Sequence, residues 1–492
     1  MSALVRSILS AMLLVSLGAC SLAPKHVRPD APVPAKVVAG SEESVDGLGM
    51  YGVGIKEFFR DPRLQELIAL GLSHNRDLRV ALLAAARARA LYSVERAERF
   101  PQVSADGADT SSAPYDKRWT RNVQAQGTAI FELDLFGRLR NLSESAFETY
   151  LASDEASRAA MLALISQIAR SYLDERLAVE RLALARSTVE SRRRSLEFMA
   201  GRVQSGQSSL LELEQARSLL AAAEASSAEQ QRQVELAGNA LALQVGDYDL
   251  PDLPAPLSLE DQEMANLPGG VDSSVLLRRP DILGAEHRLK ATNADIGAAR
   301  AAFFPTLSLT GTLGYMSTDL SDLFIYANGA WSFAPRAALP IFQGGRQMAE
   351  LKAAHIAKES AVADYERTIQ NAFKEVADGL RSRASFRDQH EAQLAYVQSL
   401  RLVEELAMAR YVSGAVSYLE VLDAQRAVFQ AEMDLLSLRR DQLANEVSLY
   451  SSLGGGLEDA VSRVPEPDGR TPSKAETTGG DGEPSGADVV SP

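Results

Sequence analysis

The chain repeats itself, and each copy of the repeat contains a helical stretch that is too long for a compact globular domain. Residues 202–206 match residues 410–414 at an offset of about 208 residues. The stretches that precede these motifs, residues 139–202 and 347–410, contain no proline. At 1.5 Å per residue, each would form a helix roughly 95 Å long. The repeat therefore predicts an elongated molecule built from two similar halves.

Each half has the same predicted order of elements: a helix, two strands, the long helix and a shorter return helix. The first helices are expected at residues 75–99 and 280–303, and a proline follows each of them. The strands are indicated by apolar residues at every second position, and the clearest series is Val123, Ala125, Gly127, Ala129, Phe131, Leu133 and Leu135. Pro335 lies in the fourth predicted strand and restricts that strand to an edge of the sheet or to a bulge.

The predicted domain boundaries follow the repeat. They are a signal peptide at 1–19, a lipidated extended segment and equatorial region at 20–74, a first repeat at 75–246, a linker at 247–279, a second repeat at 280–456, and a tail at 457–492. From about Val464 the tail is rich in proline, glycine, serine and acidic residues, a composition that cannot build a core. We therefore expect the tail to be disordered.

The N-terminus has the pattern of a secretory signal that ends in a lipidation site. Arg6 precedes a short apolar run, and the string Leu17-Gly18-Ala19-Cys20 resembles a bacterial lipobox. On this interpretation Cys20 carries acyl chains such as palmitate, and Ser21 directs the lipoprotein to the outer membrane. The alternative is a plain secretory signal with an incidental cysteine. No other segment reaches 18 consecutive apolar residues, so we expect any further membrane crossing to be made of strands.

Composition argues against several classes of function. The net charge of -14 does not favour nucleic acid as a partner. The single cysteine rules out a disulfide framework, and the five histidines are scattered without metal-ligand spacing. We therefore expect no metal site and no enzyme activity, and the family that the motifs given below resemble implies no cofactor. A hydrolytic envelope enzyme remains an alternative, since the helices carry many carboxylates, but none of these lies in a distinctive motif.

Four strands cannot close a barrel, so the pattern predicts an oligomer. An open sheet in lipid would leave unpaired backbone groups, and the smallest membrane barrels have eight strands. One face of each predicted strand is polar, which favours a water-filled lumen. Spacing alone does not separate a dimer from a trimer. A structural lipoprotein that forms a periplasmic coiled coil explains the helices, but it does not explain the strands.

A series of long motifs resembles the TolC-type outer membrane factors, and among them the OprM-like lipoproteins, over residues 17–456. The resemblance rests on these strings in order: Glu57-Phe58-Phe59-Arg60-Asp61-Pro62, Asn75-Arg76-Asp77-Leu78-Arg79, Glu132-Leu133-Asp134-Leu135-Phe136-Gly137-Arg138, Arg278-Arg279-Pro280-Asp281-Ile282, Gly297-Ala298-Ala299-Arg300-Ala301-Ala302-Phe303-Phe304-Pro305 and Leu422-Asp423-Ala424-Gln425-Arg426.

The resemblance implies a membrane α+β fold, in which a homotrimer forms a 12-stranded β-barrel, with four strands per chain, continuous with a long α-helical barrel. It implies the exit duct of a tripartite multidrug efflux pump, anchored in the outer membrane and projecting into the periplasm. The implied partners are a periplasmic adaptor protein and an inner-membrane transporter of the resistance-nodulation-division type, and the implied phenotype is antibiotic resistance. A duct for type I protein secretion has the same fold and is the alternative.

The resemblance also implies which residues form the sites. Leu419, Asp423 and Arg426 match the periplasmic gate, in which rings of leucines and carboxylates from three chains narrow the tunnel. Without the resemblance, Asp423 and Arg426 would be interpreted as a solvated ion pair of little energetic weight. The turns that contain Arg202 and Gly206, and Arg410 and Gly414, match the tips on which the adaptor docks. Glycine is also expected there for a purely structural reason, the positive φ of a helix end.

Overall fold

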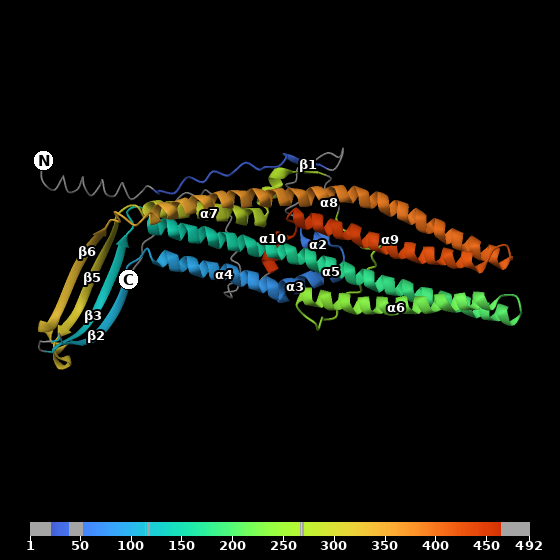
Figure 1. Ribbon diagram of the computed structural model, residues 1–492, viewed down its shortest axis with the longest axis horizontal. Helices are drawn as coiled ribbons and strands as arrows, with labels where there is room; N and C mark the ends of the chain where they lie inside the picture. Colours follow the sequence, from blue (N-terminus) through green and yellow to red (C-terminus); the bar gives the residue numbers. More distant parts are fainter. Residues whose placement is uncertain are drawn as a thin grey trace, which may run out of the picture.

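The computed structural model describes residues 21–38, 53–113, 115, 119–265, 267 and 270–463. The described chain is elongated, with a β-sheet at one end and the turns of two long helical hairpins at the other (Figure 1). The predicted signal peptide and the predicted lipidation site Cys20 lie outside the described residues.

Two helices of equal length define the long axis. Helices α5 (Arg138–Gln204) and α8 (Arg346–Val412) each contain 67 residues, which corresponds to roughly 100 Å. Each returns through a short turn into a second helix, α6 (Leu210–Val245) or α9 (Tyr418–Ser452). The predicted bounds of both long helices agree with the structure to within two residues. No helix within the described ranges combines the length and the apolar character that a membrane crossing requires.

The two shorter helices of each half follow one another along the long helix. Helix α4 (Arg76–Ala97) begins where α6 ends, and the Asn75 side chain donates to the carbonyl of Gln244 at 2.7 Å. Helix α7 (Pro280–Ala301) begins where α9 ends, and Arg279 donates to the carbonyl of Ser452 at 2.8 Å. Each junction is therefore fixed by the residue that precedes the first turn of the shorter helix.

The sheet contains four antiparallel strands in the order β2, β3, β5 and β6. These are β2 (Gln102–Ser112), β3 (Thr120–Leu133), β5 (Thr306–Ser317) and β6 (Gly329–Ala338), with two short 3-10 turns at Leu320–Asp322 and Tyr326–Asn328 between the last two strands. Strands β2 and β6 are the edges of the sheet. The position of β6 confirms the restriction that Pro335 imposes on its strand.

The middle of the molecule is held by an apolar core around the helix junctions. Its short elements are β1 (Lys36–Val38), α2 (Ile55–Phe58), α3 (Pro62–His74), β4 (Gly270–Asp272), the 3-10 helix Ser273–Arg278 and α10 (Leu457–Arg463). Phe58 stacks on Tyr450 with ring centroids 3.9 Å apart, and both side chains are buried. The region predicted at residues 20–74, an extended segment followed by an equatorial region, contains the helix α3, which Asp61 caps and Pro62 begins.

The tail predicted to be disordered from residue 457 begins with an ordered helix. Residues 457–463 form α10, in which Ala460 is fully buried. The Asp459 carboxylate accepts a hydrogen bond of 2.9 Å from the backbone N–H of Ile55, at the start of α2. This contact joins residues that are 404 positions apart, so the local composition of the tail could not indicate it.

Candidate gate and docking tips

The two hairpin turns at the far end from the sheet have the same backbone geometry. Gly206 and Gly414 have φ values of 74° and 78°, in the left-handed region. In each turn a backbone N–H bonds across the corner, from Gln207 to Arg202 at 2.8 Å and from Ala415 to Arg410 at 2.9 Å. A Cβ atom at either glycine would meet no atom within 4 Å. Backbone conformation, and not crowding, therefore requires glycine at both tips.

A small apolar cluster joins the two hairpins just behind these turns. Met199 of α5 is fully buried there against Tyr411 of α8 and Tyr418, Val421 and Leu422 of α9. The Tyr411 hydroxyl lies 3.4 Å from the Met199 sulfur. Burial raises the pKa of the Tyr418 hydroxyl. This tip cluster (Met199, Tyr411, Tyr418, Val421 and Leu422) is a separate core from the one at the helix junctions.

The three predicted gate residues lie together on the opposite, exposed face of α9. Leu419 is 49% exposed, and the side chains of Asp423 and Arg426 are 64% and 58% exposed. Arg426 contacts Asp423 of its own helix, with an Nη1–Oδ1 distance of 3.2 Å. Within one chain the arrangement is a surface ion pair beside an exposed leucine, and three copies would be needed to make a constriction.

The arginines at the tips have different surroundings. The Arg202 guanidinium lies over the rings of Tyr411 and Phe198, 5.0 Å and 5.8 Å from their centroids, and so connects the first turn to α8. Arg410 lies 3.8 Å from the carboxylate of Glu420. The structure therefore brings both tip motifs to one end of the molecule, with Arg202 packed between the hairpins and Arg410 on the surface.

One buried charge near the gate was missed by sequence reasoning. Arg192 of α5 is buried beside the tip cluster, and its burial lowers the pKa of the guanidinium, an effect that Glu404 opposes and Arg426 reinforces. The sequence shows three consecutive arginines, 192–194. Consecutive residues point in different directions on a helix, so only the packing of α8 and α9 distinguishes the inward one.

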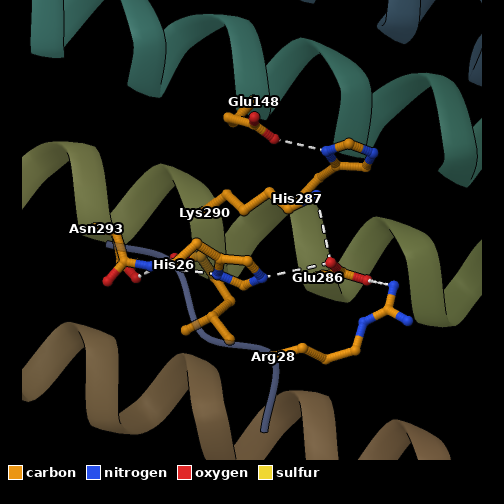
Figure 2. Close-up of polar contacts among 9 residues, drawn as sticks. His26, Arg28, Glu148, Glu286, His287, Lys290 and Asn293 are labelled. Atoms are coloured by element: carbon orange, nitrogen blue, oxygen red, sulfur yellow. Dashed lines mark hydrogen bonds and ion pairs between the residues drawn. The ribbon is translucent and has the colours of Figure 1, made fainter. Parts of the chain in front are cut away.

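The segment that follows Cys20 is bound along helix α7. Figure 2 shows Glu286 of α7 surrounded by His26 and Arg28 of this segment and by Lys290 one turn away. His26 Nε2 and Lys290 Nζ lie 3.4 Å and 3.3 Å from Oε1 of Glu286, and Arg28 pairs with Oε2. Burial opposes the charge on Glu286, but the hydrogen bond from Arg28 and the nearby cations hold the pKa of this carboxyl below its usual value. We call residues 21–28 the strap.

One family model matches most of the chain and so establishes its family. Residues 67–247 and 272–455 match the model described as outer membrane efflux protein. These two segments contain all four strands of the sheet and both helical hairpins. The chain belongs to the outer membrane efflux protein family. This efflux protein is therefore a transport protein of the outer membrane and not an enzyme.

Known proteins similar to this efflux protein include relatives whose names give different cargoes. The cation efflux system protein CusC of Escherichia coli (strain K12) is 42% identical over 445 residues, which cover 90% of this chain and 97% of CusC. The solvent efflux pump outer membrane protein SrpC of Pseudomonas putida is 41% identical over 454 residues, which cover 90% of this chain and 97% of SrpC.

Solved structures show the same fold. The open state of the MtrE outer membrane channel of Neisseria gonorrhoeae matches with a TM-score of 0.81 at 36% identity, covering 89% of this chain and 99% of MtrE. A crystal structure of CusC matches with a TM-score of 0.81 at 42% identity, covering 89% of this chain and all of the CusC chain. The efflux protein therefore has the fold of known outer membrane channels.

Proposed function

We propose that this efflux protein is one of three identical subunits of a gated exit duct in a tripartite multidrug efflux pump. The observation that carries the proposal is the open sheet, whose edges β2 and β6 have no partner strand among the described residues. Such edges are costly in lipid, where no water can bond the free N–H and C=O groups. Three copies would supply twelve strands, enough for a barrel with a water-filled bore.

The helical hairpins support the same arrangement. Each chain contributes two long helices and two pairs of shorter helices stacked end to end, which makes four helical columns. Three copies would therefore supply twelve columns around a tunnel that continues the barrel. The polar face of the sheet, which carries Thr128 and Thr312 opposite each other and Gln126 two residues further along β3, would line the bore. In the periplasm the tunnel would narrow at Leu419 and Asp423 of α9.

We propose a partner protein for the hairpin turns and a lipid anchor near the N-terminus. A periplasmic adaptor would dock on the turns at Arg202, Gly206, Arg410 and Gly414, and an inner-membrane transporter of the resistance-nodulation-division type would deliver the cargo. Lipid on Cys20 would anchor the duct in the outer membrane. The names of CusC and SrpC give different cargoes, cations and solvent, for relatives of similar length and sequence. We infer that the transporter, and not the duct, selects what passes.

Single-channel recording tests this function. The purified protein in a planar bilayer should give discrete current steps. Two glycines of β5 provide a matched pair of variants: a Cβ at Gly314 would lie 2.3 Å from the carbonyl oxygen of Ala125, whereas a Cβ at Gly311 would meet nothing within 4 Å. Gly314→Val should abolish the steps because it breaks the pairing of β3 with β5, and Gly311→Val should retain them. Absence of steps from both the native protein and Gly311→Val would contradict the proposal.

A further inference from the structure

Two unpaired charges of opposite sign lie on the two free edges of the sheet. Among the described residues, the polar face of the sheet carries three charged side chains, Asp106 of β2, Glu132 of β3 and Arg336 of β6. Glu132 is bound by Arg138 through two hydrogen bonds of 2.9 Å. Within the described part of the chain, the Asp106 side chain accepts one hydrogen bond, of 3.1 Å, from the Ser104 hydroxyl. Arg336 has no hydrogen bond or ion pair with any other residue that the structure describes.

On the other face of the sheet, two opposite charges on adjacent strands form an ion pair. Asp109 of β2 and Arg121 of β3 lie on that face, and Arg121 Nε donates to Asp109 Oδ1 at 3.0 Å. Opposite charges on neighbouring strands stabilise the pairing of those strands. Asp106 and Arg336 could be paired in the same way only by a strand that joins the free edge of β2 or β6.

The strand register determines which residues would meet at such a junction. Gln102, the first residue of β2, lies in one row with Ala334, and β6 continues four residues further, to Ala338, toward the helices. At the other end, Gly329 of β6 lies in one row with Gly107, and β2 continues five residues further, to Ser112. Successive strands are therefore shifted along the sheet, as the strands of a barrel must be.

Continuing this shift into a second copy gives a definite pairing. The displacement between β2 and β6 is four or five residues over three strand-to-strand steps, or about 1.5 residues per step. A fourth step, from β6 to β2 of the next copy, brings the total displacement to about six residues. An even total is required, because an odd one would turn the polar side of one strand outward. Arg336 lies two positions beyond Ala334, whose row contains Gln102. It therefore lies in the row that position 100 would occupy if β2 were extended by two residues. A shift of six places it opposite Asp106.

We propose that Arg336 of each subunit forms an ion pair with Asp106 of the neighbouring subunit, across the seam where β6 meets β2. The inference rests on the proposed trimer and adds the register in which its sheet closes. Three such pairs would form, one at each seam, all on the polar face that lines the bore. They neutralise the only charges on that face that lack an ionic partner within the described chain.

Disulfide cross-linking tests the register. The double variant Asp106→Cys/Arg336→Cys, oxidised in outer membranes, should give covalent dimers and trimers on a non-reducing gel. The matched controls move one cysteine by two residues on the same face, in Ser104→Cys/Arg336→Cys and Ala108→Cys/Arg336→Cys. Diagonal neighbours lie about 7–8 Å apart, beyond the usual Cα separation in a disulfide. Both controls should therefore cross-link at least fivefold less.

The outcomes separate this inference from the proposed function. The native mass of each reduced variant is measured first. Trimers that cross-link best through Ser104→Cys or Ala108→Cys would overturn the proposed register and leave the duct intact, and so would trimers that cross-link through none of the pairs. Reduced protein that is monomeric, in the native chain as well as in the variants, would overturn the duct itself.

Charge exchange provides a second measurement that needs no disulfide. Asp106→Arg and Arg336→Asp each place like charges across the seam, and each should lower the temperature at which trimers dissociate in detergent. The double variant Asp106→Arg/Arg336→Asp restores opposite charges and should recover most of the loss. Additive losses in the double variant would overturn the ion pair.

Discussion

Tyr172 of the long helix α5 donates a hydrogen bond of 2.6 Å to Asp61, the residue that caps the first turn of α3. Gln262 of the linker donates to the same carboxylate oxygen at 2.6 Å. Asp61 and Tyr172 are both almost completely buried. Burial raises the pKa of the Tyr172 hydroxyl, and the hydrogen bond to Asp61 raises it further. One carboxylate therefore ties together α3, α5 and the linker at the middle of the molecule.

Replacing Tyr172 by Phe should destabilise the helix junctions. The change removes a donor from a buried carboxylate, which typically costs about 1–3 kcal/mol. Thermal unfolding in detergent, followed by circular dichroism, should show a lower midpoint. Tyr396→Phe, at an exposed position of α8, should have no effect. Equal midpoints for the two variants would show that the Asp61 contact does not contribute to stability.

The gate assignment predicts that Asp423→Ala increases leak current. Removing the carboxylate takes away the partner of Arg426 and one ring of charge from the proposed constriction. Single-channel recordings should show a severalfold higher resting conductance. Asp434→Ala is the matched control, because Asp434 is an exposed aspartate three turns further along the same helix. Resting current that is unchanged in Asp423→Ala would remove the gate from this position.

The docking assignment predicts that Gly206→Leu and Gly414→Leu abolish resistance to pump substrates while trimers persist. A residue with a Cβ in the left-handed region costs roughly 1–2 kcal/mol, which should distort the tip locally without unfolding the hairpins. Susceptibility testing and native mass measure the two effects separately. Gly238→Leu in α6, where a Cβ also meets no atom within 4 Å, should retain resistance. Full resistance in both tip variants would contradict a docking role.

The strap predicts a dependence of stability on acidic pH. The pKa of Glu286 is lowered in the folded protein, so its contribution is complete above the unfolded value, roughly 4.3, and is lost as pH falls through the lower folded value. The thermal midpoint of the native protein should therefore fall more steeply below about pH 4 than that of Glu286→Gln. The control Glu359→Gln, at an exposed position of α8, should behave as the native protein. Parallel curves of thermal midpoint against pH for the native protein and Glu286→Gln would show that Glu286 does not cause the loss of stability at acidic pH.

The sequence predicts well those elements whose cause is local. Alternation at every second residue locates the strands, and the absence of proline locates the two long helices. Gly206 and Gly414 are predicted correctly at the turns because positive φ requires glycine there.

Other features depend on contacts between distant residues, and no local pattern indicates them. Helix α10 is held in part by the bond from Ile55 to Asp459. The strap binds through Glu286, which is 258 residues from Arg28. Arg192 is identical in type to its two neighbours and is distinguished only by what packs on it. In each case the tertiary contact, and not local sequence preference, determines the structure.

The mass of the detergent-extracted protein decides whether several chains share one barrel. A chain whose sheet ends in two free edges should be found as three copies, and native mass spectrometry of the intact protein should give a single species of three subunits. A monomer, in detergent that preserves the current steps of the same sample, would contradict a barrel shared by three chains.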